Sequence, residues 1–164
     1  MNNLALPIRF GIIISAVLIS FFLILSLFNL HTNPLFSLFN GVITGFGIYE
    51  TIRYHKLEQG KRFAYSGGFI AGILAGFIAT IIFTIFFLFY ATEANPKFLS
   101  NLLVVFKGDY NVGVGLVSFV VAIMGFATTV VLTLTSMQFF KSSRNISYVR
   151  HDFEEGKAPL RKVD

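Results

Sequence analysis

The fold is decided by residues 63–92, which read FAYSGGFIAGILAGFIATIIFTIFFLFYAT and contain no charged side chain. A helix rises about 1.5 Å per residue and the hydrocarbon core of a bilayer is about 30 Å thick, so roughly 20 apolar residues make one crossing. Residues 63–92 are long enough for one crossing with tilt and too short for two. The stretch therefore predicts a single transmembrane helix.

Three further uncharged stretches reach a similar length, at residues 10–30, 31–49 and 110–140. The chain is 55% hydrophobic and 13% charged, which is far from the balance of a soluble domain. The apolar runs are continuous, whereas the strands of a transmembrane barrel alternate polar and apolar residues. We therefore expect an all-α integral membrane domain over residues 1–141. Its four transmembrane helices form two hairpins, at about residues 8–30, 34–54, 63–92 and 110–140.

Basic residues are concentrated on one side of the expected membrane. Eleven of the thirteen Lys and Arg residues lie before the first span, in residues 53–62 or after Phe140, and only Lys97 and Lys107 lie opposite. Because Lys and Arg accumulate on the cytoplasmic side, we expect both termini to be cytoplasmic, in a bacterial inner membrane. The net charge of +5 is explained by this topology and by attraction to membrane lipids, so no nucleic-acid partner is expected.

Two segments outside the spans carry apolar residues. In the outer loop between the third and fourth spans, Asn95 and Pro96 suit the start of a helix, and we expect a short interfacial helix at about residues 96–106. The cytoplasmic tail, residues 142–164, is polar but is expected to dock on a partner or on the cytoplasmic interface. The docking residues are Ile146, Tyr148, Val149 and Phe153. Residues 53–62 are expected to extend the second span in part as a helix that stops at Gly60.

Small residues recur at a spacing of four in the third span, which is typical of faces where transmembrane helices pack closely. One ridge consists of Ala64, Gly68, Gly72, Gly76, Thr80 and Thr84, and the adjacent ridge of Ala71, Ala75 and Ala79. The second span has Gly41 and Gly45 in the same pattern, and the fourth has Gly125 and Thr129. We expect these faces to meet the third span within one chain. The alternative is that one of these faces packs against a second copy of the chain or against a partner subunit, because a helix with two small faces can pack closely against two neighbouring helices.

The spans contain no arrangement typical of catalysis or of a cofactor site. A charge at the bilayer centre costs at least about 2.5–3.5 kcal/mol and normally marks an ion or substrate path, but no span carries one there. Glu50 lies near the cytoplasmic end of the second span, one turn from Arg53, and is interpreted as half of a solvated ion pair. The chain has no cysteine, and its three histidines are scattered along the sequence. We therefore expect no catalytic residue, no metal site and no cofactor.

Residues 47–99 resemble a bacterial family of small four-span membrane proteins known as domain of unknown function family 4199. The resemblance depends on Gly47-Ile48, the basic and Tyr-rich residues 49–56, Phe63-x-Tyr65, the pair Gly68/Gly72, and Asn95-Pro96-x-Phe98-Leu99. It implies an inner-membrane location, no established activity, and a membrane glycosyltransferase as a class of partner. The outer loop is shorter and the tail longer than the family pattern.

These features favour a non-enzymatic accessory or assembly subunit of an inner-membrane protein complex. The packing ridges and the apolar residues of the tail suit contact with other membrane proteins. The alternative is a small dimeric transporter, flippase or channel whose path is lined by Thr and Ser rather than by charges. An intramembrane enzyme ranks third, because the spans lack a general base, a nucleophile and an oxyanion donor that could act together.

Overall fold

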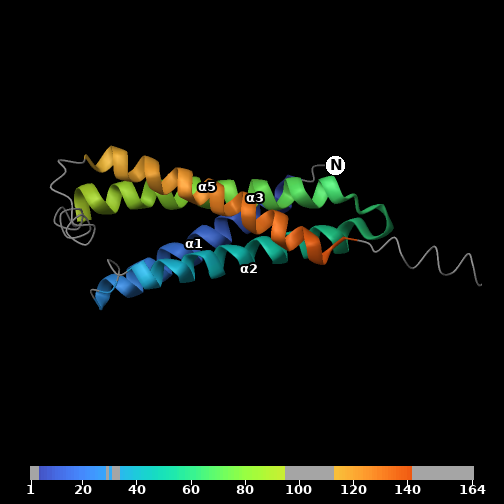
Figure 1. The fold of residues 1–164 in the computed structure, drawn as a ribbon, viewed down its shortest axis with the longest axis horizontal. Helices are drawn as coiled ribbons and strands as arrows, with labels where there is room; N and C mark the ends of the chain where they lie inside the picture. The colour runs from blue at the N-terminus through green and yellow to red at the C-terminus, as the bar shows by residue number, and fades with distance from the viewer. Residues whose placement is uncertain (1–3, 29, 31–33, 95–112, 142–164) are drawn as a thin grey trace, which may run out of the picture.

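The computed structural model of the chain is a bundle of four long helices (Figure 1). It describes residues 4–28, 30, 34–94 and 113–141, and the following elements lie within these ranges. The helices are α1 (Ala5–Leu27), α2 (Pro34–Gln59), α3 (Tyr65–Phe89) and α5 (Val114–Phe139). A short 3-10 turn, η1 (Gly60–Arg62), follows α2, and a π-helical turn, η2 (Tyr90–Ala94), continues α3. No described residue is in a strand.

Three of the four helices are long and apolar enough to cross a membrane. They are α1, α3 together with the beginning of η2, and α5. The helix α2 is as long as α5 but less apolar over its whole length, and Glu50, Arg53, Lys56 and Glu58 lie in its second half. The chain is therefore an all-helical protein with at least three segments suited to membrane crossing.

The boundaries of the helices differ from the expected spans by up to five residues. The largest difference is at α2, which continues beyond residue 54 to Gln59, as the expected helical extension of the second span. Gly60 then adopts a φ of +52°, the left-handed conformation that glycine reaches without steric penalty and that commonly ends a helix. The expected interfacial helix (96–106) and the cytoplasmic tail (142–164) lie outside the described residues.

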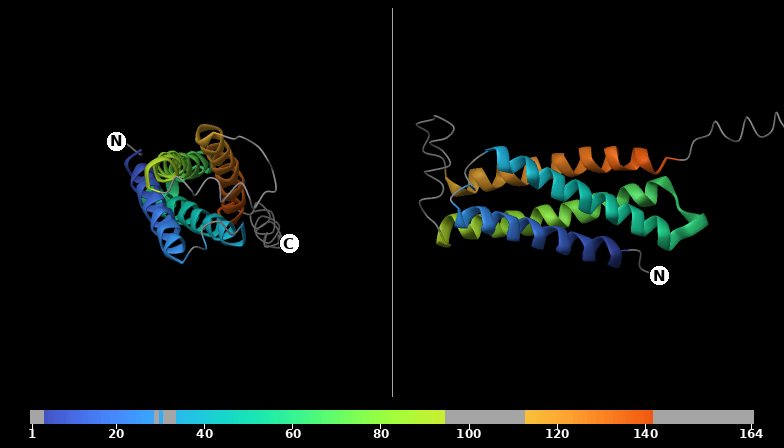
Figure 2. Two further views of the ribbon diagram at one scale, coloured as in Figure 1. Left: turned by 90° about the vertical axis from the view of Figure 1, so that its left-hand side faces the viewer. Right: turned by 90° about the horizontal axis from the view of Figure 1, so that it is seen from below.

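The helix α3 is the central helix of the bundle. It packs along α1 on one side and along α5 on another, and it also contacts α2. Figure 2 shows the four helices running side by side, with α1 and α2 as one hairpin. We call the end of the bundle at Leu27 and Phe89 the distal end, and the end at Ala5, Gln59 and Phe139 the proximal end.

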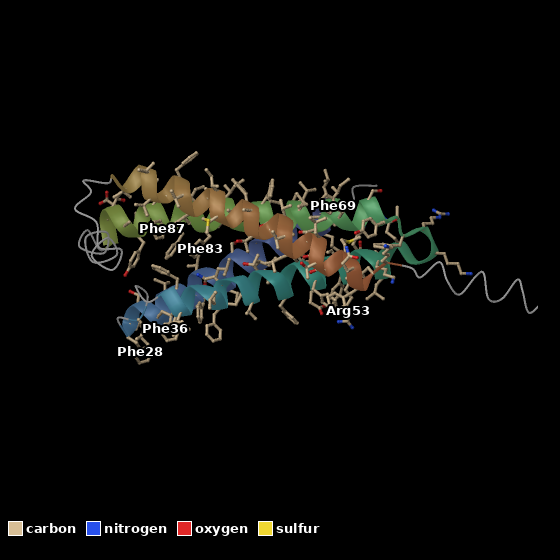
Figure 3. All side chains as sticks on the ribbon, in the orientation of Figure 1. Phe28, Phe36, Arg53, Phe69, Phe83 and Phe87 are labelled. Atoms are coloured by element: carbon tan, nitrogen blue, oxygen red, sulfur yellow. The ribbon has the colours of Figure 1, made fainter. Side chains whose placement is uncertain are left out.

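Aromatic side chains fill the distal end, where the α1–α2 hairpin and the α3–α5 pair diverge in Figure 1. The Phe22 ring of α1 meets the rings of Phe83, Phe87 and Tyr90 edge-on, with centroids 5.0–6.5 Å apart. Ser26 and Tyr90 share a hydrogen bond between their hydroxyls of 2.5 Å. Figure 3 shows the labelled Phe83 and Phe87 on the side of α3 that faces this hairpin. Several of the phenylalanines therefore fill gaps between helices, and others face outward.

Candidate functional site

The tightest contact in the bundle lies between α3 and α5, where glycines and threonines interlock. A Cβ atom placed on Gly76 would collide with the methyl group of Thr129 and lie 2.7 Å from its Oγ1. One turn along, the arrangement is reversed, and a Cβ on Gly125 would lie 2.5 Å from the methyl group of Thr80. Each threonine therefore occupies the space that the facing glycine leaves free. We call this interface, which runs along α3 from Gly68 to Thr84 and along α5 from Met137 back to Ser118, the α3–α5 seam.

The ridge on α3 continues toward the proximal end with the same partner helix. A Cβ on Gly72 would lie 2.8 Å from the methyl group of Thr133, and a Cβ on Gly68 would lie 3.2 Å from the sulfur of Met137. Ala64 does not belong to this interface, because it precedes the first residue of α3 in extended conformation and is exposed. The ridge thus begins at Gly68.

The second small face of α3 packs against α1. Ala71, Ala75 and Ala79 are almost completely buried, and Ile14 and Leu18 of α1 pack against the last two. Gly11 of α1 comes so close that a Cβ there would lie 2.8 Å from the backbone carbonyl oxygen of Ala75. Both small faces of α3 are therefore filled within one chain.

Gly41 and Gly45 of α2 do not face α3, which differs from the expectation. No atom of the described residues outside α2 lies within 4 Å of a Cβ placed on Gly41, and a Cβ on Gly45 would meet Leu132 of α5 at 3.3 Å. The face of α2 that enters the bundle instead carries Ile48 and Ile52, which are fully buried. The reason is that these larger side chains bury more apolar surface than the glycines would, and the gap left by Gly72 accommodates them.

Two close-packing glycines lie outside the ridges found in the sequence, Gly11 and Gly47. A Cβ on Gly47 would lie 2.7 Å from the terminal methyl group of Ile14, so α1 and α2 also approach closely. In the first span, Gly11 and the buried Ser15 have the spacing of four that marks small-residue faces. That spacing could have identified the face of α1 that packs on α3.

Hydroxyl groups along the helices fall into two sets. In the first set, the hydroxyl donates to a carbonyl of its own helix three or four residues earlier, as Thr44, Thr51 and Thr135 do at 2.7–2.9 Å. In the second set, the buried oxygens of Thr84, Ser118, Thr129 and Thr133 have no hydrogen-bond partner among the described residues. All members of the second set belong to the α3–α5 seam.

Charged and titratable groups in the described residues lie mainly at the proximal end, away from the seam's centre. Glu50 accepts a hydrogen bond from Arg53 at 3.1 Å; the Arg53 side chain is 55% exposed and that of Glu50 18%, so the expected ion pair is present and is solvated mainly on the arginine side. His55 is buried beside the Phe63 ring, and a Cβ on Gly67 would lie 3.2 Å from its Nε2. Within the part of the chain that the structure describes, no three His, Cys, Asp or Glu residues are grouped to hold a metal ion.

The seam therefore holds α3 and α5 together and contains neutral hydroxyl groups. Its described residues include no acidic, basic or charged side chain. Its four unpaired hydroxyls could donate to or accept from water or another neutral polar group. The apolar tail residues Ile146, Tyr148, Val149 and Phe153 lie outside the described residues.

The family described as "Protein of unknown function (DUF4199)" matches residues 9–111, which is more than half of the chain. The match includes α1, α2 and α3 and ends before α5 begins. No curated protein and no solved structure matches the chain. The match is wider than the resemblance over residues 47–99 and includes the same glycine-rich third helix, so the chain belongs to the DUF4199 family.

Proposed function

We propose that this chain is a non-enzymatic accessory or assembly subunit of a bacterial inner-membrane protein complex. The observation that carries the proposal is the exposed surface of α2 around Gly41. Both small faces of α3 are occupied by α1 and α5, whereas Gly41 has no neighbour within 4 Å among the described residues. Around it, Leu38, Val42 and Phe46 are 67–71% exposed. A helix of a larger membrane protein could approach the backbone of α2 at this point.

In this proposal, α2 is the fourth transmembrane helix and both termini are cytoplasmic. Two features support the assignment. The helix α2 contacts α1 from the Phe21–Phe39 ring pair toward the distal end to the Phe10–Tyr54 ring pair toward the proximal end, and all Lys and Arg residues in the described ranges lie at the proximal end. If the proximal end faces the cytoplasm, these basic residues lie on the cytoplasmic side, where Lys and Arg accumulate in membrane proteins. The charged half of α2 then lies in the cytoplasmic headgroup region.

The remaining parts of the proposal concern residues 95–112 and 142–164. Residues 96–106 form a short helix in the outer interface, and the tail contributes a second contact with the partner through its apolar residues. The partner is a larger membrane protein, and a membrane glycosyltransferase is the class that the family resemblance implies. A homodimer through the same face of α2 is the competing arrangement.

Purification of the full chain from native membranes in a mild detergent tests this proposal. We expect a stoichiometric partner to copurify with the wild-type chain and to be lost from Gly41→Leu, because the leucine would hold the partner's backbone away from α2. The matched control is Gly115→Leu on α5, which also adds a leucine where no described atom of another element lies within 4 Å. The control should retain the partner. A monomeric wild-type chain, or equal retention by both variants, would contradict the proposal, and a second copy of the chain as sole partner would favour the homodimer.

A small transporter, flippase or channel is the second candidate, and the unpaired hydroxyls of the α3–α5 seam favour it. Such a path would select neutral or weakly hydrated solutes, since the described parts of α3 and α5 carry no charge. Flux measurements on liposomes that contain the purified chain test this candidate. Flux of ions, small solutes or lipids that falls in Gly72→Leu would support it, and absence of any flux would leave only the accessory role.

A further inference from the structure

The buried side of α5 consists almost entirely of hydroxyl side chains. Its buried residues are Ser118, Thr129, Thr133, Ser136 and Met137. The opposite side carries exposed apolar residues such as Val120 and Val131. The helix therefore turns its polar stripe toward α3 and its apolar side outward, as a helix surrounded by lipid does.

Three hydroxyls of this stripe lack a hydrogen-bond partner among the described residues although they are at least nine-tenths buried. They are those of Ser118, Thr129 and Thr133, with exposed fractions of 5%, 0% and 0%. Other buried hydroxyls, such as that of Thr51, donate to their own helix. Thr129 differs because its methyl group and Oγ1 are both pressed against Gly76 of the facing helix. A buried hydroxyl without a hydrogen-bond partner is unfavourable. These three hydroxyls therefore indicate that a molecule that can donate and accept hydrogen bonds binds beside them.

We propose that the α3–α5 seam is a water-accessible path that opens from the distal end when α5 moves away from α3. Water suits the seam because its hydroxyls both donate and accept, and because no charged residue lies on the described parts of either helix to select an ion. The distal end is the side of access. There, no described atom lies within 4 Å of a Cβ placed on Gly113 or Gly115, whereas at the proximal end a Cβ on Gly68 would lie 2.8 Å from the Phe63 ring and 3.2 Å from the Met137 sulfur. The path does not depend on the accessory role or on any partner.

Cysteine substitution tests the path directly, because the native chain contains no cysteine. The seam variants are Ser118→Cys and Thr129→Cys, and the matched controls on the outward side of the same helix are Val120→Cys and Val131→Cys. The probe is a negatively charged methanethiosulfonate reagent, applied to membranes from each side in turn. Modification is read from the fraction of chain that still reacts with a maleimide-linked polymer after denaturation.

We expect the reagent to modify both seam cysteines from the distal side at least about tenfold faster than the controls. The reason is that the thiolate is the reactive form, and each pKa unit by which an apolar surrounding raises a thiol's pKa lowers the thiolate fraction about tenfold. Removing a neighbouring hydroxyl with Thr133→Val should slow modification of Thr129→Cys, because the substitution keeps the shape of the side chain but not its affinity for water.

Two results would overturn the path. In the first, the seam cysteines react no faster than Val120→Cys and Val131→Cys. In the second, Ser118→Cys reacts but Thr129→Cys does not, which would mean that the reagent reaches only the end of the helix. Each variant is accepted only if it elutes and unfolds like the wild-type chain. If Thr129→Cys fails this criterion, Thr133→Cys takes its place with the same two outcomes.

Discussion

Gly76→Leu is expected to force α5 away from α3 and to give the largest loss of stability of any substitution in the seam. Even a methyl group at this position would collide with the side chain of Thr129, whose Cβ lies only 3.0 Å away. Overpacking of a close contact costs about 1–3 kcal/mol, and more when the backbone must move. The measurement is thermal unfolding in detergent followed by circular dichroism at helical wavelengths, because the chain has no tryptophan to report fluorescence.

The control for this prediction is Gly41→Leu, which adds the same side chain to a helix position with no described neighbour within 4 Å. It should unfold at about the wild-type temperature. Equal destabilisation by Gly76→Leu and Gly41→Leu would show that the loss of a glycine, rather than the contact with Thr129, is responsible.

A double-mutant cycle assigns the effect to the interlocked pair. Gly76→Ala alone should destabilise the bundle, because the added methyl collides with the two branches of the Thr129 side chain. Thr129→Ala removes both branches and leaves only the 3.0 Å contact to its Cβ, so the double variant should recover part of the loss. Residues in direct contact usually show interaction energies of about 0.5–3 kcal/mol, whereas additive effects would contradict the interlock.

The helical architecture could be predicted from the sequence because charge is excluded from long stretches. The stretch that contains α3 has no charged residue over residues 63–92, and length alone then selects one crossing. The end of α2 was harder to predict, because charged residues are equally compatible with a loop and with a helix that leaves the membrane. The Glu50–Arg53 pair, spaced i,i+3 on one side of the helix, is compatible with continuation, and Gly60 ends it.

The close-packing faces of α3 could also be found from their spacing, but their partners could not. The pattern of Gly68, Gly72 and Gly76 shows that some backbone or short side chain comes near, and it does not say which helix supplies it. The same pattern on α2 led to the wrong partner for Gly41 and Gly45, since the bulkier Ile48 and Ile52 face α3. Interfaces in a bundle depend on the fit of two surfaces, and a sequence pattern describes only one of them.

The unpaired hydroxyls could not be predicted at all from residue type. Thr51 and Thr129 are both buried threonines in long helices, yet only the first donates to its own helix. The difference depends on which rotamer the neighbouring helix permits, and Gly76 brings that neighbour into contact with Thr129. The family match ends before α5, so the hydroxyl stripe belongs to the part of the chain that lies beyond the matched region.

Gly11→Val is expected to separate α1 from α3 and to destabilise the bundle about as strongly as Gly76→Leu. A Cβ on Gly11 would lie 2.8 Å from the carbonyl oxygen of Ala75 and 2.8 Å from the Cβ of Ile78. Neither atom can move by a side-chain rotation, because one belongs to the backbone of α3 and the other is fixed to it. The expected cost is therefore at or above about 3 kcal/mol, the upper part of the usual range for overpacking. Unfolding in detergent, followed as for Gly76→Leu, measures it.

Gly47→Ala provides the comparison that separates a rigid obstacle from a flexible one. The nearest atoms to a Cβ on Gly47 are Cγ1 and Cδ1 of the Ile14 side chain, which move with its χ1 and χ2 angles. Alanine favours the helix over glycine by about 1 kcal/mol at both positions, so this gain cancels and the comparison measures the crowding alone. Gly47→Ala should therefore cost much less than Gly11→Ala, although both add one methyl group to a glycine in contact with another helix. Equal costs would mean that α1 can shift along α3, and that the backbone contact at Ala75 does not fix the position of α1.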